Sequence, residues 1–295
     1  QLNGQVQQLS ALAQVRCAQW HGTAWAYGPS RNPAWLSLAA ARGKFVGNRR
    51  VWGAGRPDSA IDLESFKAFA AWCETKNLTF DGIFDQPLSA REMIEAIALM
   101  GRGTITEATG KLGVVWDAPN QPVVQVFGMS NIIAGSFEIS YATEQLADEL
   151  VVNYVNPDND WQRDAARVLA PGVVTPVKTR QIELFGCTSK TRAGKLGNLY
   201  VAQNLYRAKK YTWRSDFDGM WATRGDVVQF SHDLATYDYS GRLVEGTTAS
   251  VLKLDRSVPL GAGGSVTLVK PDGTIATYGV STGAGACLPN ERLSS

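Results

Sequence analysis

Apolar residues in the first third of the chain recur three and four positions apart, which predicts α-helices. Residues 31–34 read Arg-Asn-Pro-Ala, and Asn32 is a good N-cap residue directly before a proline that suits the first helical turn. A helix is therefore predicted from Pro33 to near Gly43. A Trp-rich strand over 19–25 is expected before it, and a loop over 53–57 after it.

Two further helices have their own start signals. Asp62 caps a helix that carries a stripe of apolar side chains, namely Phe66, Phe69, Ala70 and Cys73. Ser89 and Glu92 form a capping-box pattern ahead of another apolar stripe, and that helix ends at Gly101. With a strand over 112–116, these helices predict an α/β subdomain that extends to about residue 117.

After Pro119 the pattern changes to short stretches with strand-like alternation or many β-branched residues. Strands are predicted over 123–127, 137–141, 149–155 and 181–185, with a loop of turn-forming residues over 156–160. A helix is expected near 188–210, broken or begun late at Gly194 or Gly197.

From Tyr211 onwards the sequence predicts strands and turns alone. Arg224-Gly225-Asp226 is interpreted as a turn that leads into a buried strand over 227–230, and residues 252–256 as another strand. Pro271-Asp272-Gly273 predicts a hairpin turn between 265–269 and 274–280. The turn spacing favours a barrel or sandwich.

These elements predict an α+β, β-rich fold. The expected division is an entering segment at 1–30, an α/β subdomain at 31–118, a β-rich domain with one helix at 119–215, and a barrel or sandwich at 216–295. The chain has 295 residues and begins without Met, so we expect it to be part of a longer protein. It has no run of 18 apolar residues, so stable membrane insertion by this segment is not expected, and it shows no signal-peptide pattern.

The net charge is only +2, but the charges are separated along the chain. Residues 112–162 contain seven acidic residues and no Lys or Arg, whereas residues 163–214 contain eleven basic residues and two acidic ones. Such asymmetry indicates either two solvated faces or electrostatic partners. Nucleic-acid recognition by sequence is not expected, because the basic residues are divided among a strand, a loop and a helix.

No catalytic, cofactor-binding or metal-binding set emerges. His21 and His232 are the only histidines, and Asp233 follows His232 on a strand, where adjacent side chains point to opposite faces. The four cysteines are widely spaced without a C-x-x-C motif, so buried apolar roles are expected for Cys17, Cys73, Cys187 and Cys287. The glycine-rich stretches at 53–55, 261–264 and 283–285 match no nucleotide-binding pattern.

Acidic residues offer the nearest approach to chemistry. Asp81, Asp85, Glu92 and Glu95 are close in sequence, but an acidic loop and a helix face explain them as well as a pair of catalytic carboxylates does. Asp158-Asn159-Asp160 lacks the glycine and glutamate of a calcium loop.

Several short motifs, in the same order, resemble the tail-tip or hub proteins of siphophages, which are called host-specificity or tip attachment proteins in lambda-like phages. They are Asn32-Pro33-Ala34, Ile61-Asp62 with Cys73, Asn131-Ile132 to Phe137, Tyr154-x-Asn156-Pro157-Asp158, Gly225-Asp226-Val227-Val228, Gly241-Arg242-Leu243 and Leu254-Asp255-Arg256. The resemblance covers some 250 residues. Arg224 departs from it, since the family often has Pro at that position.

The resemblance implies tandem tube-like β-barrel hub domains with helical insertions and no enzymatic activity or cofactor. It implies a virion protein of the tail tip, assembled in the bacterial cytoplasm as a homotrimer. Its partners would be the tail tube, distal tail, central fibre and tape measure proteins, and DNA would pass through the ring without sequence-specific binding. Residues 112–162 would then partly face the channel, while 163–214 would meet a neighbour.

Two alternatives from other classes stay open. One is a glycan-degrading enzyme of a phage tail, which would depend on Asp81 or Asp85. The other is a carbohydrate- or receptor-binding module that stacks sugars on Trp20, Trp25, Trp35 and Trp52.

Overall fold

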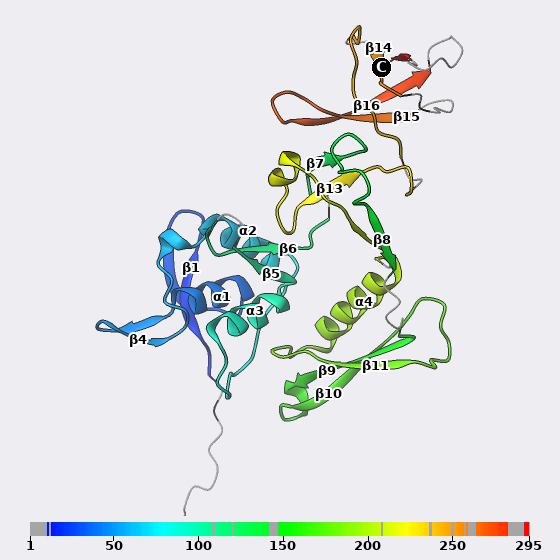
Figure 1. The fold of residues 1–295 in the computed structure, drawn as a ribbon. Helices are drawn as coiled ribbons and strands as arrows, with labels where there is room; N and C mark the ends of the chain where they lie inside the picture. Colours follow the sequence, from blue (N-terminus) through cyan, green and yellow to red (C-terminus); the bar gives the residue numbers. More distant parts are fainter. Residues whose placement is uncertain are drawn as a thin grey trace, which may run out of the picture. The chain divides into compact units, whose positions relative to one another are not determined.

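The computed structural model describes residues 11, 13–107, 110–119, 121–141, 147–207, 209–235, 238–248, 251–256, 258, 264–282 and 292–294. The fold is mixed α+β, and its sheets are small, with two to four strands each (Figure 1). None of the sheets in these ranges closes on itself, so the tube-like barrels stay a prediction.

The chain forms two compact units that interleave in sequence. Unit 1 comprises residues 1–117 and 144–207, and unit 2 comprises residues 118–143 and 208–295. The predicted change of character near residue 118 lies at a boundary between units, whereas the predicted segment 119–215 contributes to both. The four predicted domains stay a prediction.

The three predicted helices of unit 1 begin at their predicted caps. They are α1 (Pro33–Arg42), α2 (Leu63–Thr75) and α3 (Ala90–Met100). The Asn32 side chain accepts a hydrogen bond from the Ala34 N–H at 3.0 Å. Asp62 caps α2, and Ser89 and Glu92 make both bonds of the capping box. These caps satisfy backbone N–H groups that a helix leaves unpaired at its start.

The core of unit 1 lies between these helices and a hairpin. Phe66 and Phe69 of α2 are completely buried, as is Leu38 of α1. The hairpin pairs β5 (Gly103–Thr106) with β6 (Gly113–Trp116), which confirms a strand near 112–116. A side chain at Gly103 would collide with the Phe69 ring, since a Cβ there would lie 2.6 Å from it.

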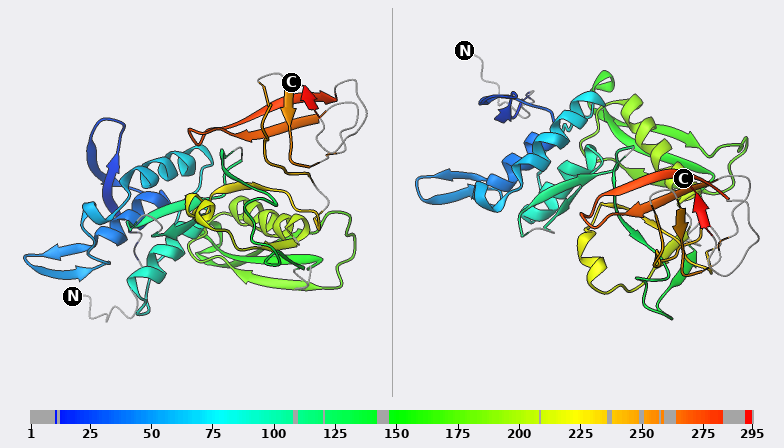
Figure 2. Two further views of the ribbon diagram at one scale, coloured as in Figure 1. Left: turned by 45° about the horizontal axis from the view of Figure 1, so that its top comes forward. Right: turned by 90° about the horizontal axis from the view of Figure 1, so that it is seen from above.

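Two more hairpins belong to unit 1. β1 (Arg16–Trp20) pairs with β2 (Trp25–Pro29), so the predicted strand over 19–25 is wrong. Residues 21–24 form the turn instead, and Gly22 takes a φ of +88° that suits glycine. β3 (Lys44–Val46) pairs with β4 (Arg49–Trp52) and extends away from the helices in every view (Figures 1 and 2). A short 3₁₀ helix, η1 (Asp58–Ala60), precedes α2.

The second half of unit 1 is a three-stranded sheet covered by one helix. β9 (Glu149–Asn156) pairs antiparallel with β10 (Gln162–Leu169) and parallel with β11 (Thr179–Glu183). The turn after β9 includes η2 (Pro157–Asn159). Helix α4 (Lys190–Tyr206) lies along one face of this sheet (Figures 1 and 2).

The predicted break in α4 is wrong, because the helix continues through both glycines. Gly197 is the position of closest approach to the sheet. A Cβ there would lie 2.8 Å from Val168 and 2.9 Å from Val152, whereas a Cβ on Gly194 would meet nothing within 4 Å. The glycine thus serves packing rather than termination.

In the part of unit 2 that the structure describes, the strands form three small sheets. β7 (Val123–Phe127) pairs parallel with β13 (Val227–Phe230), and β8 (Glu138–Tyr141) pairs antiparallel with β12 (Lys209–Thr212). The third has the order β14 (Val251–Lys253), β17 (Arg292–Ser294), β16 (Ile275–Thr282) and β15 (Gly264–Val269). The β15–β16 hairpin confirms the predicted turn at 271–273.

Two expectations for unit 2 are wrong. The 3₁₀ helix η3 (Phe217–Trp221) lies in a region where only strands and turns were predicted. The strand after Arg224-Gly225-Asp226 is not buried, and Val227 is 39% exposed, because β13 pairs with β7 in a sheet of only two strands. Among the described residues, no helix is both long and apolar enough to cross a membrane.

Candidate functional site

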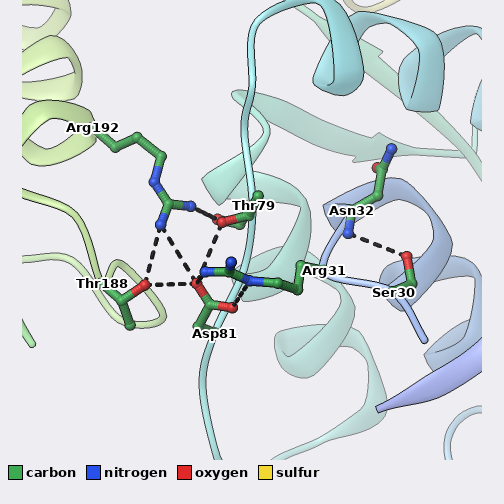
Figure 3. Close-up of polar contacts among 7 residues, drawn as sticks. All are labelled: Ser30, Arg31, Asn32, Thr79, Asp81, Thr188 and Arg192. Carbon is green, nitrogen blue, oxygen red and sulfur yellow. Dashed lines mark hydrogen bonds and ion pairs between the residues drawn. The ribbon is translucent and has the colours of Figure 1, made fainter. Parts of the chain in front are cut away.

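The most elaborate polar arrangement of the described chain surrounds Asp81, in the extended segment that follows α2 (Figure 3). Arg31, just before α1, donates from Nε to Oδ1 and from Nη2 to Oδ2 of Asp81, both at 2.6 Å. This two-pronged pairing matches the planar guanidinium to the carboxylate.

The other side of the Asp81 carboxylate faces the beginning of α4. Thr188 donates its hydroxyl to Oδ2 at 2.7 Å, and Arg192 lies 3.5 Å from the same oxygen. Arg192 also donates to the Thr188 hydroxyl at 3.1 Å and to the Thr79 carbonyl at 2.9 Å, and it contacts the Thr79 hydroxyl. We call Arg31, Thr79, Asp81, Thr188 and Arg192 the Asp81 clamp.

Backbone and aromatic contacts hold the clamp in place. The Asp81 N–H donates to the Gly186 carbonyl at 2.9 Å, and the Phe80 N–H donates to the Arg31 carbonyl at 2.9 Å. Phe80 is buried and its ring lies 5.7 Å from that of Phe185. Gly186 leaves space for the Phe80 ring, because a Cβ on residue 186 would lie 2.4 Å from that ring. The clamp therefore joins the helical half of unit 1 to its β9–β11 half.

The electrostatics favour an ionised Asp81. Burial alone would raise the pKa of Asp81, but the hydrogen bonds from Arg31 and Thr188 and the charges of both arginines outweigh it and lower that pKa. The hydrogen bond to Asp81 in turn raises the pKa of Arg31. Only 17% of the Asp81 side chain and 14% of the Arg192 side chain are exposed.

This geometry suits a structural connection. Both carboxylate oxygens of Asp81 accept hydrogen bonds from charged or hydroxyl donors, and the lowered pKa keeps the group without a proton to donate. A general acid would require the opposite shift. The clamp holds two parts of the fold in register, and its carboxylate is occupied by Arg31 and Thr188.

The other acidic candidates lie outside the Asp81 clamp. Glu92 belongs to the α3 capping box, Glu95 pairs with Arg91 at 2.9 Å, and Asp85 lies exposed in the loop before α3. Asp85, Glu92 and Glu95 are thus an acidic loop and a helix face, and Asp81 alone belongs to the clamp. Among the described residues, no group of three His, Cys, Asp or Glu side chains is arranged to hold a metal ion.

The two histidines lie in turns or against other side chains. The His232 ring stacks on Phe137 with centroids 3.9 Å apart, and its Nδ1 accepts from the Leu234 N–H at 3.1 Å. Asp233 pairs with Arg256 at 3.0 Å. His21 is exposed in the β1–β2 turn. His232 is therefore a packed residue of unit 2.

Three of the four tryptophans proposed for sugar stacking form a cluster. The Trp25 ring lies edge to face with Trp20 at 5.6 Å and with Trp35 at 5.7 Å. Lys67 lies over Trp20 and Arg42 over Trp25, at 4.1 and 4.5 Å from the ring centroids. Each cation covers one face of its ring, and Trp35 is buried, with 3% of its surface exposed. Trp52 is separate, on β4.

The remaining candidates serve structure. Asp226 accepts hydrogen bonds from the Thr223 N–H and hydroxyl at 2.7 and 2.8 Å, so Arg224-Gly225-Asp226 is a turn, as predicted. Cys17, Cys73 and Cys187 are free and buried, as predicted. Burial is the main cause that raises the pKa of each thiol, to about 12 for Cys73. Cys287 and the glycines at 261, 263, 283 and 285 lie outside the described residues.

The sequence did not indicate Arg31, Thr188 or Arg192 as partners of Asp81. One signal was available. Lys190 and Arg192 lie in the first turn of α4, which contains no acidic residue. Cations at a helix N-terminus are unfavourable, so a buried arginine there requires a carboxylate from elsewhere.

Comparison with known proteins gives the class. Residues 89–245, more than half of the chain, match the family described as "Putative phage tail protein". The chain belongs to this family and is a structural protein of the phage tail. No curated protein matches it.

Two solved structures with low identity also match. One is the 43 kDa tail protein of prophage MuSo2 from Shewanella oneidensis, with 12% identity over 61% of this chain and a TM-score of 0.37. The other is a chain of the virion of a native gene transfer agent particle, with 14% identity over 88% of this chain and a TM-score of 0.34. This chain spans 56% and 55% of those two chains, respectively.

Proposed function

We propose that the protein is a subunit of the tail hub or tip. In this role it closes the distal end of the tail tube, joins the tube to the central fibre and opens for DNA ejection. Three copies form a ring that contacts the tail tube, distal tail, central fibre and tape measure proteins. DNA passes through the ring without sequence-specific contacts.

The observation that carries the proposal is the exposure of large apolar side chains in loops, at the end of α4 and in η3. Among large apolar side chains in the described residues, several are more than three-quarters exposed: Ile83, Val174, Val177, Tyr206, Phe217, Met220 and Trp221. Phe217, Met220 and Trp221 all lie in η3, and neighbouring exposed apolar side chains are typical of interaction sites, while open strand edges add unpaired backbone groups. Such surfaces are expected where neighbouring subunits of a virion cover them.

Several acidic residues of the 112–162 stretch already have partners within the chain. Asp117 pairs with Arg207 at 2.6 Å and Glu149 with Arg167 at 3.5 Å, all within unit 1. Asp148 accepts from the N–H groups of Val177 and Lys178. These acids are engaged inside the chain, so a channel-facing role applies to the exposed Glu138, Asp158 and Asp160 in preference to them.

The hub role is tested by locating the protein within the phage particle. In the phage or prophage that encodes it, a nonsense mutation in this gene is expected to give tails without a closed tip. An affinity tag visualised by electron microscopy is expected at the distal tail end of complemented particles. A tag found along the tube or at the head-proximal end would exclude the hub role.

A further inference from the structure

The β3–β4 hairpin, residues 44–52, is an exposed arm. All of its residues are exposed, and its four large apolar side chains, Phe45, Val46, Val51 and Trp52, are 42–64% exposed. A lone two-stranded hairpin is marginally stable in water, and an apolar one carries an aggregation risk. Its apolar side chains are therefore expected to meet a partner.

The root of the arm is fixed to α1. The Ala54 N–H donates to the Ala40 carbonyl at 2.8 Å, and the Arg56 N–H donates to the Ala41 carbonyl at 2.9 Å. Gly43 has a φ of +71°, and a Cβ there would lie 2.5 Å from the Trp52 carbonyl oxygen. The direction of the arm is therefore set before binding. Less conformational entropy is then lost when the arm associates with a partner.

The charge of the arm defines its partner. Lys44, Arg49 and Arg50 give three positive charges, and residues 44–52 contain no acidic residue. Within the described part of the chain none of the three has an ion pair, and Arg50 donates only to the Ala54 carbonyl, at 2.6 Å. A complementary surface is acidic and carries an apolar or aromatic group.

The β9–β10 turn of unit 1, residues 156–161, has this composition. Asp158 and Asp160 are exposed and form no ion pair among the described residues, and Trp161 is 51% exposed. We call residues 156–161 the acidic turn. Its root is fixed, since Tyr154 and Asn156 both donate to Asp164 at 3.0 Å.

The backbone of the acidic turn is strained. Asp160 and Trp161 both have positive φ, at +50° and +59°. A tryptophan in this region is uncommon and costs on the order of 1 kcal/mol. Strain of this kind persists where a displayed side chain is useful. Here it presents an aromatic ring beside two unpaired carboxylates.

We propose that the arm of one copy docks on the acidic turn of a second copy. The arm extends away from the β9–β11 sheet of its own unit in every view, which leaves another molecule as the source of the turn (Figures 1 and 2). Arg49 would pair with Asp158, and Trp161 would receive a cationic or apolar side chain of the arm. The contact joins two different patches, so it is head-to-tail and can close a ring. The inference rests on the proposed function only in requiring several copies.

Cysteine cross-linking of the full chain tests the contact directly. In a Cys287→Ser background the other cysteines are buried, so Asn48→Cys at the arm tip and Asn159→Cys in the acidic turn are the reactive sites. Mild oxidation of a mixture of the two variants is expected to give a covalent dimer. Each variant alone is expected to give no covalent dimer. The control is a mixture of Asn159→Cys with Thr75→Cys, which lies on the exposed end of α2, and it is also expected to give no covalent dimer. Absence of the mixed dimer, or self-linking of Asn48→Cys, would overturn the proposal.

A charge swap tests the energetics. Arg49→Glu and Asp158→Lys are each expected to weaken self-association about tenfold, measured by sedimentation velocity, and the double variant is expected to recover most of it. Lys111→Glu, an exposed loop residue with the same charge change as Arg49→Glu, is the control. A double variant no better than either single variant, or a wild-type chain that is monomeric at every concentration, would refute the contact.

The two proposals fail separately. A chain found at the tail tip without the cross-link would remove the arm contact and keep the hub. A cross-link in a chain found elsewhere in the tail would keep the arm contact and remove the hub role.

Discussion

Arg31 and Asp81 are separated by 50 residues in sequence and meet through two parallel hydrogen bonds of 2.6 Å each. Arg192 approaches the same carboxylate from the start of α4. The Asp81 side chain thereby joins three distant parts of unit 1. Its loss is expected to affect the stability of the protein more than any chemistry.

Asp81→Asn is expected to destabilise the protein by about 1–3 kcal/mol, since it removes charge-assisted hydrogen bonds and leaves the largely buried Arg192 without its counter-charge. Arg31 is half exposed, so its pairing contributes less than a buried one would. Urea unfolding of the full chain measures the change. Asp85→Asn, which removes an exposed charge from the same loop, is the matched control and is expected to change little. Equal effects of the two substitutions would contradict a clamp.

The stability that Asp81 supplies is expected to depend on pH in one direction. Its pKa is lowered in the folded state, so folding favours the ionised form, and the contribution is complete above the ordinary carboxyl pKa of about 3.9. It is lost as the pH falls through the lowered pKa. The difference between wild type and Asp81→Asn should therefore be constant from about pH 5 to 8 and shrink below about pH 4. Urea unfolding over a pH series measures it, and a difference that grows on acidification would show the sign to be wrong.

The two glycines of α4 are expected to respond in opposite ways to alanine. Gly197→Ala places a methyl group against Val152 and Val168 and should cost about 1–3 kcal/mol, despite the better helix propensity of alanine. Gly194→Ala meets open space and should stabilise by up to about 1 kcal/mol. Thermal unfolding of the pair separates packing from propensity. A stabilising Gly197→Ala would show that α4 does not approach the sheet this closely.

Gly225→Val is expected to impair folding or assembly. Gly225 has a φ of +100°, which a β-branched residue adopts only at a cost of about 1–2 kcal/mol, and the turn sets the entry into β13. Gly225→Asn should be milder, because asparagine tolerates positive φ better. Yields of folded protein and of infectious particles measure both. Normal particle numbers with Gly225→Val would argue against a structural role for this turn.

Much of the fold was predictable where the determinants are local. Asn32, Asp62 and the Ser89–Glu92 pair were recognised as caps because their hydrogen bonds join groups within four positions of each other. The hairpin turn at 271–273 was predicted for the same reason. The Trp-rich strand over 19–25 failed because four turn residues divide it, and hydrophobic composition alone does not show where a hairpin reverses.

The candidate site was beyond sequence reasoning. Asp81 stands near other carboxylates in the sequence, but its partners Thr188 and Arg192 lie 107 and 111 residues away, and the sequence contains no rule that pairs them. The roles of Gly194 and Gly197 in α4 do not follow from the sequence for a related reason. Whether a glycine ends a helix or admits a close neighbour depends on the surface packed against it.

The sequence by itself determined the capped helices, most short strands, the absence of a recognisable catalytic motif and the resemblance to phage tail-tip proteins. These follow from propensities, periodicity and motifs, all of which act over a few residues. The tertiary structure alone decided that residues 144–207 join the first unit, that Asp81 is clamped from three directions, and that the arm and the acidic turn are both exposed. Each of these depends on contacts between distant segments, which form only when burial of the shared core offsets the entropy of closing long loops.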